Sequence, residues 1–229
     1  SAASDVYKRQ VLGNLTTKEF DPILMLDSFD SINPDDYTAG FPMHPHRGIE
    51  TISYVSRGKM VHRDSLGNEA GISDGEVQWM NSGSGIMHEE MVPAAERLLG
   101  VQLWLNLPAK DKMSKPSYNS IKNEDIKEIE IEGGKIRLLA GKYGEHEGYK
   151  GDYLSMDYYD IHLNADAEVT LTMEEDDSVM VFTLLGDVYI DGEHIEEKTA
   201  VKLTEGDSLT IKNGNEKAQV LYMNSRALN

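Results

Sequence analysis

The stretch Phe41-Pro-Met-His-Pro-His-Arg-Gly-Ile-Glu50 contains two histidines that are two residues apart. A second stretch, Ile86-Met-His-Glu-Glu-Met91, contains a histidine and a glutamate with the same spacing. Residues i and i+2 of a β-strand point to the same face of the sheet. If both stretches are extended and adjacent in space, four side chains converge on one point. The sequence therefore predicts a metal site, with the ligands His44, His46, His88 and Glu90.

The proposed ligand set indicates the class of metal. Three imidazoles and one carboxylate suit a divalent transition metal, and we expect Fe(II), with another divalent transition metal as the alternative. Four ligands on an octahedral ion leave two positions for water, O2 or a substrate. A lone histidine in a strand is more often a structural residue than a ligand. The chain has seven histidines, however, and three of them fall in these two short motifs, which favours the metal.

Composition limits the classes of protein to which the chain can belong. A length of 229 residues is enough for one large β domain or two domains of ordinary size. There is no cysteine, which excludes disulfides, thiolate metal sites and cysteine catalysis. The net charge of −18 argues against direct binding to nucleic acid, because such proteins normally carry a basic face.

Hydropathy and cysteine usage predict where the protein resides. No run of about 18 apolar residues is present, so we expect no transmembrane helix and no membrane partner. Residues 1–10 lack the apolar core of a signal peptide. The absence of cysteine fits a reducing compartment. Together these features predict a cytoplasmic protein, and we expect it to be a monomer.

Short apolar runs that are rich in β-branched residues recur along the whole chain, with turns about every 8–12 residues, which is typical of a sandwich or barrel. A polar connector at 108–116 separates two halves of similar style. We therefore predict an N-terminal domain with the metal site at 1–118 and a metal-free C-terminal domain at 119–229. The position that matches the histidine stretch in the second half is Met173-Glu-Glu-Asp-Asp177. This acidic run lacks the ligand spacing of a calcium loop.

The sequence resembles the pirin family of the cupin superfamily. The resemblance implies an all-β bicupin, that is, two jelly-roll β-barrels. It also implies a non-haem iron in the N-terminal barrel, held by the same four residues that the spacing suggests. Some members of the family are quercetin 2,3-dioxygenases, and some eukaryotic members are nuclear transcription cofactors with a redox-sensitive iron. The motifs that carry the resemblance are Asp21 to Asp27, His44 to Glu50, Gln78 to Met80, Ser82 to Glu90 and Gly100 to Asn106.

Two functions follow from the resemblance. The first is an iron-dependent dioxygenase that acts on flavonols such as quercetin, with a small-molecule substrate and O2 as its partners. The alternative is a redox-sensing regulatory protein that acts through a protein partner without turnover. The metal ligands would be the same in both, so the sequence does not separate them.

The enzyme hypothesis needs a base that removes the enol proton of the substrate. Glu90 is the first candidate, and Glu50 and His62 are the others. We expect Glu50 to point into the barrel and to hydrogen-bond a ligand histidine from behind. His62 fits either that role or an exposed position. Gln102 and Trp104 share a strand face and either line the cavity or fill the barrel, so we assign them no role.

Overall fold

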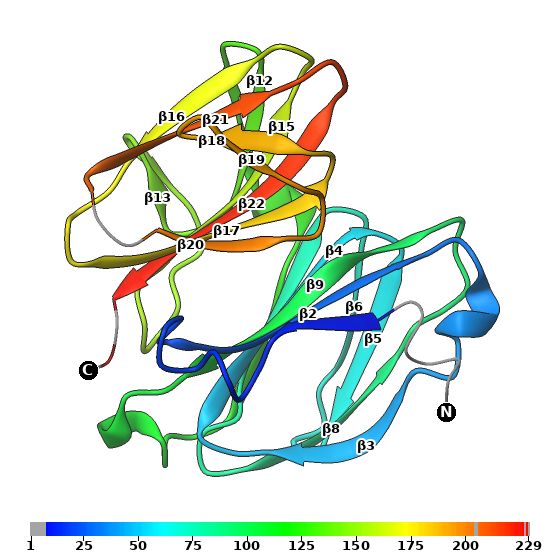
Figure 1. Cartoon of the computed structure of the whole chain (residues 1–229). Coiled ribbons are helices and arrows are strands. Elements are labelled where there is room, and N and C mark those ends of the chain that lie inside the picture. The colour runs from blue at the N-terminus through cyan, green and yellow to red at the C-terminus, as the bar shows by residue number, and fades with distance from the viewer. Residues whose placement is uncertain (1–7, 204–205, 227, 229) are drawn as a thin grey trace. The chain divides into compact units, whose positions relative to one another are not determined.

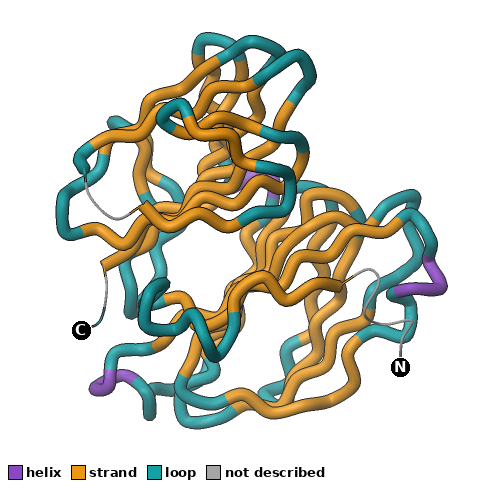
Figure 2. The backbone as a smooth tube through the Cα atoms, viewed as in Figure 1, coloured by secondary structure: helices purple, strands orange, loops and turns teal. Residues whose placement is uncertain are grey.

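The regular secondary structure of the described residues is almost entirely β-strand, and loops and turns connect the strands (Figure 2). The computed structural model describes residues 8–203, 206–226 and 228 (Figure 1). The helices within these residues are three short 3₁₀ segments: η1 Pro34–Asp36, η2 Ala109–Asp111 and η3 Asn123–Asp125. No helix in this part of the chain is long and apolar enough to span a membrane. Our prediction about a signal peptide concerns residues 1–10, of which 1–7 lie outside the described residues.

The chain forms two compact units, and the described part of the first contains ten strands in two antiparallel sheets. The strands are β1 Lys8–Leu12, β2 Ile23–Ser31, β3 Phe41–His46, β4 Ile49–Arg57, β5 Lys59–Asp64, β6 Glu69–Ser73, β7 Glu76–Asn81, β8 Ile86–Met91, β9 Leu98–Asn106 and β10 Ser117–Ile121. The six-stranded sheet has the order β1-β2-β9-β4-β7-β10, and the four-stranded sheet has the order β3-β8-β5-β6. The chain passes repeatedly between the two sheets, as in a jelly roll.

The second unit repeats this design. Its strands are β11 Lys127–Ile131, β12 Gly134–Ala140, β13 Lys142–Tyr143, β14 His146–Glu147, β15 Met156–Leu163, β16 Glu168–Thr172, β17 Asp177–Leu185, β18 Val188–Ile190, β19 Glu193–Ile195, β20 Ala200–Leu203, β21 Ser208–Asn213 and β22 Ala218–Arg226. The six-stranded sheet is β11-β12-β15-β22-β17-β20, the four-stranded sheet is β16-β21-β18-β19, and β13-β14 form a separate hairpin. The predicted all-β bicupin is confirmed, although the sheets of each jelly roll do not close into barrels.

Contacts divide the chain into Ser1–Lys18 with Ile23–Asn123 and Glu19–Pro22 with Glu124–Asn229. The first unit ends at Asn123. This boundary lies a few residues beyond the one between 118 and 119 that we predicted from the sequence. The reason is that β10 pairs with β7 along its whole length and so continues the sheet of the first unit.

The side chains of strand β9 alternate between two faces of the sheet, and both faces are covered. Val101, Leu103 and Leu105 alternate along it and are fully buried. Between them lie Gln102 and Trp104, which are half-buried and point to the opposite face. That second face lies toward the histidines, because Gln102 contacts Glu90 and Trp104 contacts His46. One face of the strand thus packs in apolar surroundings, while the other lines a polar interior.

The two units differ at the strands that correspond in sheet order. In the first unit β3 pairs with β8, and in the second β16 pairs with β21 in the equivalent place. The buried side chains that face each other across β16 and β21 are aliphatic, with Leu171 opposite Leu209 and Val169 opposite Ile211. Aliphatic side chains offer no metal ligand, which gives a physical reason for the prediction of a metal-free second unit.

Candidate metal centre

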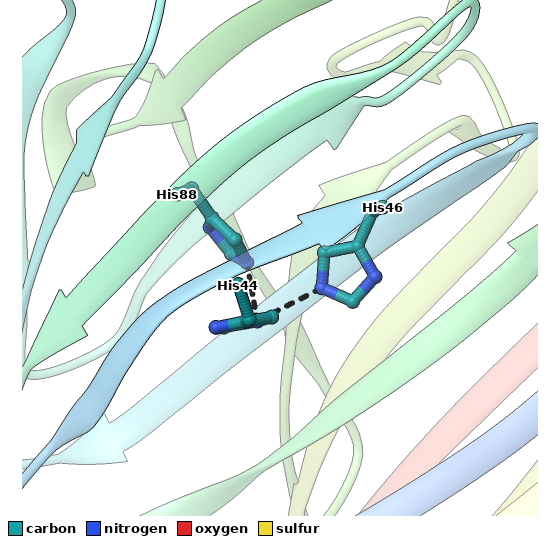
Figure 3. A group of neighbouring side chains, drawn as sticks. All are labelled: His44, His46 and His88. Carbon is teal, nitrogen blue, oxygen red and sulfur yellow. Dashed lines mark hydrogen bonds between the residues drawn. The ribbon is translucent and has the colours of Figure 1, made fainter.

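Three histidine rings from β3 and β8 meet at one point in the first unit (Figure 3). The antiparallel register places His44 directly opposite His88, and His46 follows two residues later on the same face of β3. The Nε2 atom of His44 lies 3.0 Å from that of His46 and 2.9 Å from that of His88. The structure therefore places the Nε2 atoms of three of the predicted ligands close together.

The spacing of these nitrogens fits an octahedral ion. Imidazole–metal bonds of about 2.1 Å at right angles would separate neighbouring nitrogens by about 3.0 Å. The hydrogen-bond pattern also fits, because the Nδ1 atom of His44 lies 2.7 Å from the carbonyl oxygen of Pro42. A carbonyl oxygen only accepts, so Nδ1 of His44 carries the hydrogen and Nε2 presents its lone pair. The donor set therefore fits a divalent transition metal such as iron.

Burial keeps two of the rings neutral. It lowers the pKa of His88 to about 3, with further contributions from the neighbouring histidines. Burial, with a smaller contribution from the neighbouring His44, lowers the pKa of His46 to about 4. Neutral imidazoles bind a metal ion without first losing a proton. These two rings are therefore ready to act as ligands at neutral pH.

Glu90 follows His88 on β8, but its carboxylate is held apart from the three Nε2 atoms. Gln78 Nε2 donates to Glu90 Oε1 at 2.8 Å, and Gln102 Nε2 approaches the same oxygen at 3.3 Å. This oxygen lies 3.9 Å from Nδ1 of His88, which is not the nitrogen that meets the other rings. The structure thus brings together three of the four predicted ligands, and ligation by Glu90 stays a prediction.

The carboxyl of Glu90 has the properties of a base that works near neutral pH. The side chain is 3% exposed, and burial raises its pKa to about 7, although the hydrogen bonds from Gln78 and Gln102 oppose this rise. A base is most effective when its pKa lies near the operating pH. Glu90 can therefore exchange a proton with a neighbouring group under ordinary conditions.

Glu50 lies differently from our expectation. In β4 it shares a face with Ile52, whereas the face toward Glu90 holds Ser53, which pairs with Gln102. The carboxylate of Glu50 accepts a hydrogen bond from Trp79 Nε1 on that other face. The two-residue periodicity of β3 does not continue into β4, because the chain turns at Gly48 with φ of 71° and enters the other sheet. The expectation that Glu50 points toward the histidines is therefore corrected.

His62 is fully buried beside the cluster. Its Nδ1 atom lies 3.3 Å from Nδ1 of His88, and its Nε2 atom lies 2.6 Å from Oδ2 of Asp64. The ring of Tyr118 stacks on it with a centroid distance of 3.9 Å and an interplanar angle of 12°. The sequence allowed His62 either an exposed position or a position behind a ligand histidine, and the structure shows the second.

Several residues of the site had no role in our sequence interpretation. Gln78 and Gln102 hold Glu90, Asp64 holds His62, and the ring of Trp104 meets that of His46 edge-on at 5.2 Å. The buried Nε1 of Trp104 has no hydrogen-bond partner among the described residues. Gln102 was one of two residues that the sequence allowed to line the cavity, and it is a polar residue within an otherwise apolar strand. Nothing in the sequence of β7 distinguishes Gln78 in this way.

We expect the metal affinity of the wild-type protein to depend on the proton of Glu90. With a pKa of about 7, the carboxyl is protonated at lower pH, and a metal ion must displace that proton before Glu90 can act as a ligand. Below pH 7, each unit of decreasing pH should therefore lower the affinity of the wild type about tenfold more than it lowers the affinity of Glu90→Gln. Calorimetric titration of both proteins with Zn²⁺ at several pH values below 7 measures how steeply each affinity depends on pH. Equal slopes would show that the histidines bind the ion without Glu90.

Comparison with known proteins identifies relatives over nearly the whole chain. A family profile described as Pirin matches residues 5–105, and one described as Pirin C-terminal cupin domain matches residues 158–229. The pirin-like protein of Caulobacter vibrioides is 35% identical over 216 residues, which are 93% of this chain and 78% of that protein.

Solved structures show the same relationship. A quercetin 2,3-dioxygenase from Acinetobacter baumannii has a TM-score of 0.87 and 31% identity, covering 96% of this chain and 80% of that one. A bacterial pirin from Escherichia coli, solved in complex with nickel(II), has a TM-score of 0.74 and 20% identity, covering 96% and 91%. The second similarity concerns the fold alone.

Proposed function

The chain belongs to the pirin family, and on that premise we propose that it is an iron-dependent dioxygenase acting on flavonols such as quercetin. The observation that carries this proposal is the convergence of His44, His46 and His88, which offers three nitrogen ligands to one ion and leaves its other positions to oxygen ligands. The similarity to the Acinetobacter baumannii quercetin 2,3-dioxygenase supports the reaction and the substrate class.

The metal and the protein would contribute different parts of the chemistry. Iron(II) bound by the three histidines supplies a Lewis acid and a template for an oxygen-containing substrate. The three imidazole donors suit several divalent transition metals. The three histidine nitrogens support the presence of a divalent transition metal. The choice of iron among these metals rests on the family.

The proton chemistry belongs to Glu90. A flavonol loses the proton of its 3-hydroxyl group before its ring can be oxidised, and Glu90 is the buried carboxylate next to the histidines. Gln78 and Gln102 each donate to this carboxylate and orient it. The unpartnered Nε1–H of Trp104, beside His46, is available to an oxygen of the substrate. These residues would bind, orient and deprotonate the flavonol.

Other properties remain as we predicted them from the sequence. We propose a cytoplasmic monomer that takes its substrate and O2 from solution. The regulatory alternative, in which the metal changes oxidation state and a protein partner responds, uses the same three histidines. No contact in the site favours it over turnover, so we treat it as an outcome of the experiment below.

Oxygen uptake tests the proposal. Iron(II)-loaded protein of measured iron content should consume O2 when quercetin is added, with matching loss of flavonol absorbance. The metal-free protein serves as the control and should consume none. If fully loaded protein consumes no O2 with quercetin or with several other flavonols, the dioxygenase function is wrong and the regulatory function takes its place.

A further inference from the structure

A line of buried side chains extends from the metal site into the four-stranded sheet. His88 turns Nε2 toward His44 at 2.9 Å and Nδ1 toward Nδ1 of His62 at 3.3 Å. His62 in turn places Nε2 at 2.6 Å from Oδ2 of Asp64. The rings of His62 and His88 are 0% and 1% exposed, so water does not compete for these contacts. Each histidine thus uses one nitrogen toward the metal site and the other toward Asp64.

The direction of every hydrogen bond in this line follows from Asp64. Its Oδ1 accepts from the backbone N–H groups of Leu66 and Asn68 at 2.8 and 3.1 Å. Its Oδ2 accepts from Asn68 Nδ2 at 2.9 Å. A carboxylate that receives three donors in this way acts as an acceptor toward its fourth neighbour as well. Nε2 of His62 must therefore carry a hydrogen and donate it to Asp64.

The nitrogen that carries the hydrogen in each of the two histidine rings is then determined. A neutral imidazole has one N–H donor and one acceptor nitrogen. If Nε2 of His62 donates, its Nδ1 accepts, and Nδ1 of His88 must supply the hydrogen. Nε2 of His88 is left with a lone pair that faces the other two ligands. His44 reaches the same tautomer by donating from Nδ1 to the carbonyl oxygen of Pro42.

We propose that Asp64 and His62 are positioning residues that fix the tautomer of His88, so that its Nε2 is free of hydrogen and directed at the metal. This inference rests on the metal site of the proposed function and adds the groups that prepare it. The stacked ring of Tyr118 restricts rotation of His62. The hydroxyl of Tyr118 donates to Gln78, which holds Glu90, so the same packing supports both sides of the site.

The substitution Asp64→Asn should reverse the line of hydrogen bonds. The amide oxygen would stay with the backbone N–H groups of Leu66 and Asn68, and the amide nitrogen would then donate to Nε2 of His62. The side-chain amide of Asn68, which donates to Oδ2 of Asp64 in the wild type, would turn over and accept from the same amide nitrogen. His62 would carry its hydrogen on Nδ1 and donate to His88, whose own hydrogen would move to Nε2 and block the metal. We expect metal affinity to fall about 10–100-fold, the usual effect of losing a group behind a ligand. Competition titration of Zn²⁺ against a chromophoric chelator measures it.

A matched control lies in the second unit, where His162 Nε2 is 2.8 Å from Oδ2 of the buried Asp160. This pair has the same two-residue spacing but belongs to the unit without the histidine cluster. Asp160→Asn should therefore leave Zn²⁺ affinity unchanged. Equal losses of affinity in both variants would show a general effect on folding and would contradict a specific role for Asp64.

Nitrogen-15 NMR of the histidine rings reads the tautomers directly, without substrate and without turnover. In metal-free wild-type protein we expect the hydrogen of His62 on Nε2 and that of His88 on Nδ1, and in folded Asp64→Asn we expect both reversed. A wild-type spectrum with the hydrogen of His88 on Nε2 would overturn the inference, even if the variant fails to fold. Because the measurement involves no flavonol, a protein that lacks dioxygenase activity would leave it intact.

Discussion

Iron-loaded Glu90→Gln protein should oxidise quercetin about 10²–10⁴ times more slowly than the wild type, the range typical of a lost general base. Glutamine has the size of glutamate and can remain between Gln78 and Gln102, so the pocket should keep its shape. An amide does not accept a proton at neutral pH, whereas the buried carboxyl of Glu90 has a pKa of about 7. The substitution therefore removes the basic group while changing little else.

The neighbouring residue Glu89 provides the control for this experiment. It lies on the same strand, but its side chain points outward and forms an ion pair with Arg63 at 3.3 Å. Glu89→Gln should retain the wild-type rate. Iron must be measured on each sample used for kinetics, because Glu90 is also a predicted ligand. A fully iron-loaded Glu90→Gln protein that turns over quercetin at the wild-type rate would remove Glu90 from the role of base.

Local spacing predicts that His44, His46 and His88 come together, and the structure places them together. The pattern of alternate residues in β3 and β8 is a property of each strand by itself, and it places His44 with His46 and His88 with Glu90 on shared faces. The pairing of the two strands then brings His44 opposite His88. The conformation of the Glu90 side chain depends on Gln78 and Gln102 from two other strands, and spacing along β8 does not specify it.

The error at Glu50 has a different origin. Alternation holds only within one strand, and Glu50 is separated from the histidines by the turn at Gly48 and by the change of sheet. The contact between His62 and His88 likewise depends on the pairing of β5 with β8, which places Asp64 opposite His88. Such register is a long-range property of the fold, so the sequence left the position of His62 open.

The second unit shows how much a loose internal repeat can predict. The sequence indicated a second jelly roll without a histidine pair, and the structure repeats the six- and four-stranded sheets. From the sequence, the counterpart of the histidine stretch is the acidic run at 173–177. By sheet order the counterpart of β3 is instead β16, whose buried residues Val169 and Leu171 are aliphatic. The residues Glu174, Glu175 and Asp176 of this run are exposed between β16 and β17, and Asp177 begins β17.

The account depends most on the claim that His44, His46 and His88 hold one metal ion in the first unit. The substitution His88→Ala removes the nitrogen from β8 and leaves two imidazoles, both from β3. The ion then loses the ligand that links the two strands, and we expect binding to be abolished. The control is His162→Ala, because His162 is a partly exposed histidine of the second unit, outside the cluster.

Metal content per chain, measured on protein purified without a chelating tag and then loaded with iron(II), tests this claim most directly. Circular dichroism on the same samples confirms that each variant is folded. We predict one tightly bound ion per chain in the wild type and in His162→Ala, and none in folded His88→Ala. Full occupancy in folded His88→Ala would contradict the account, because it would place the metal at a site other than the three histidines.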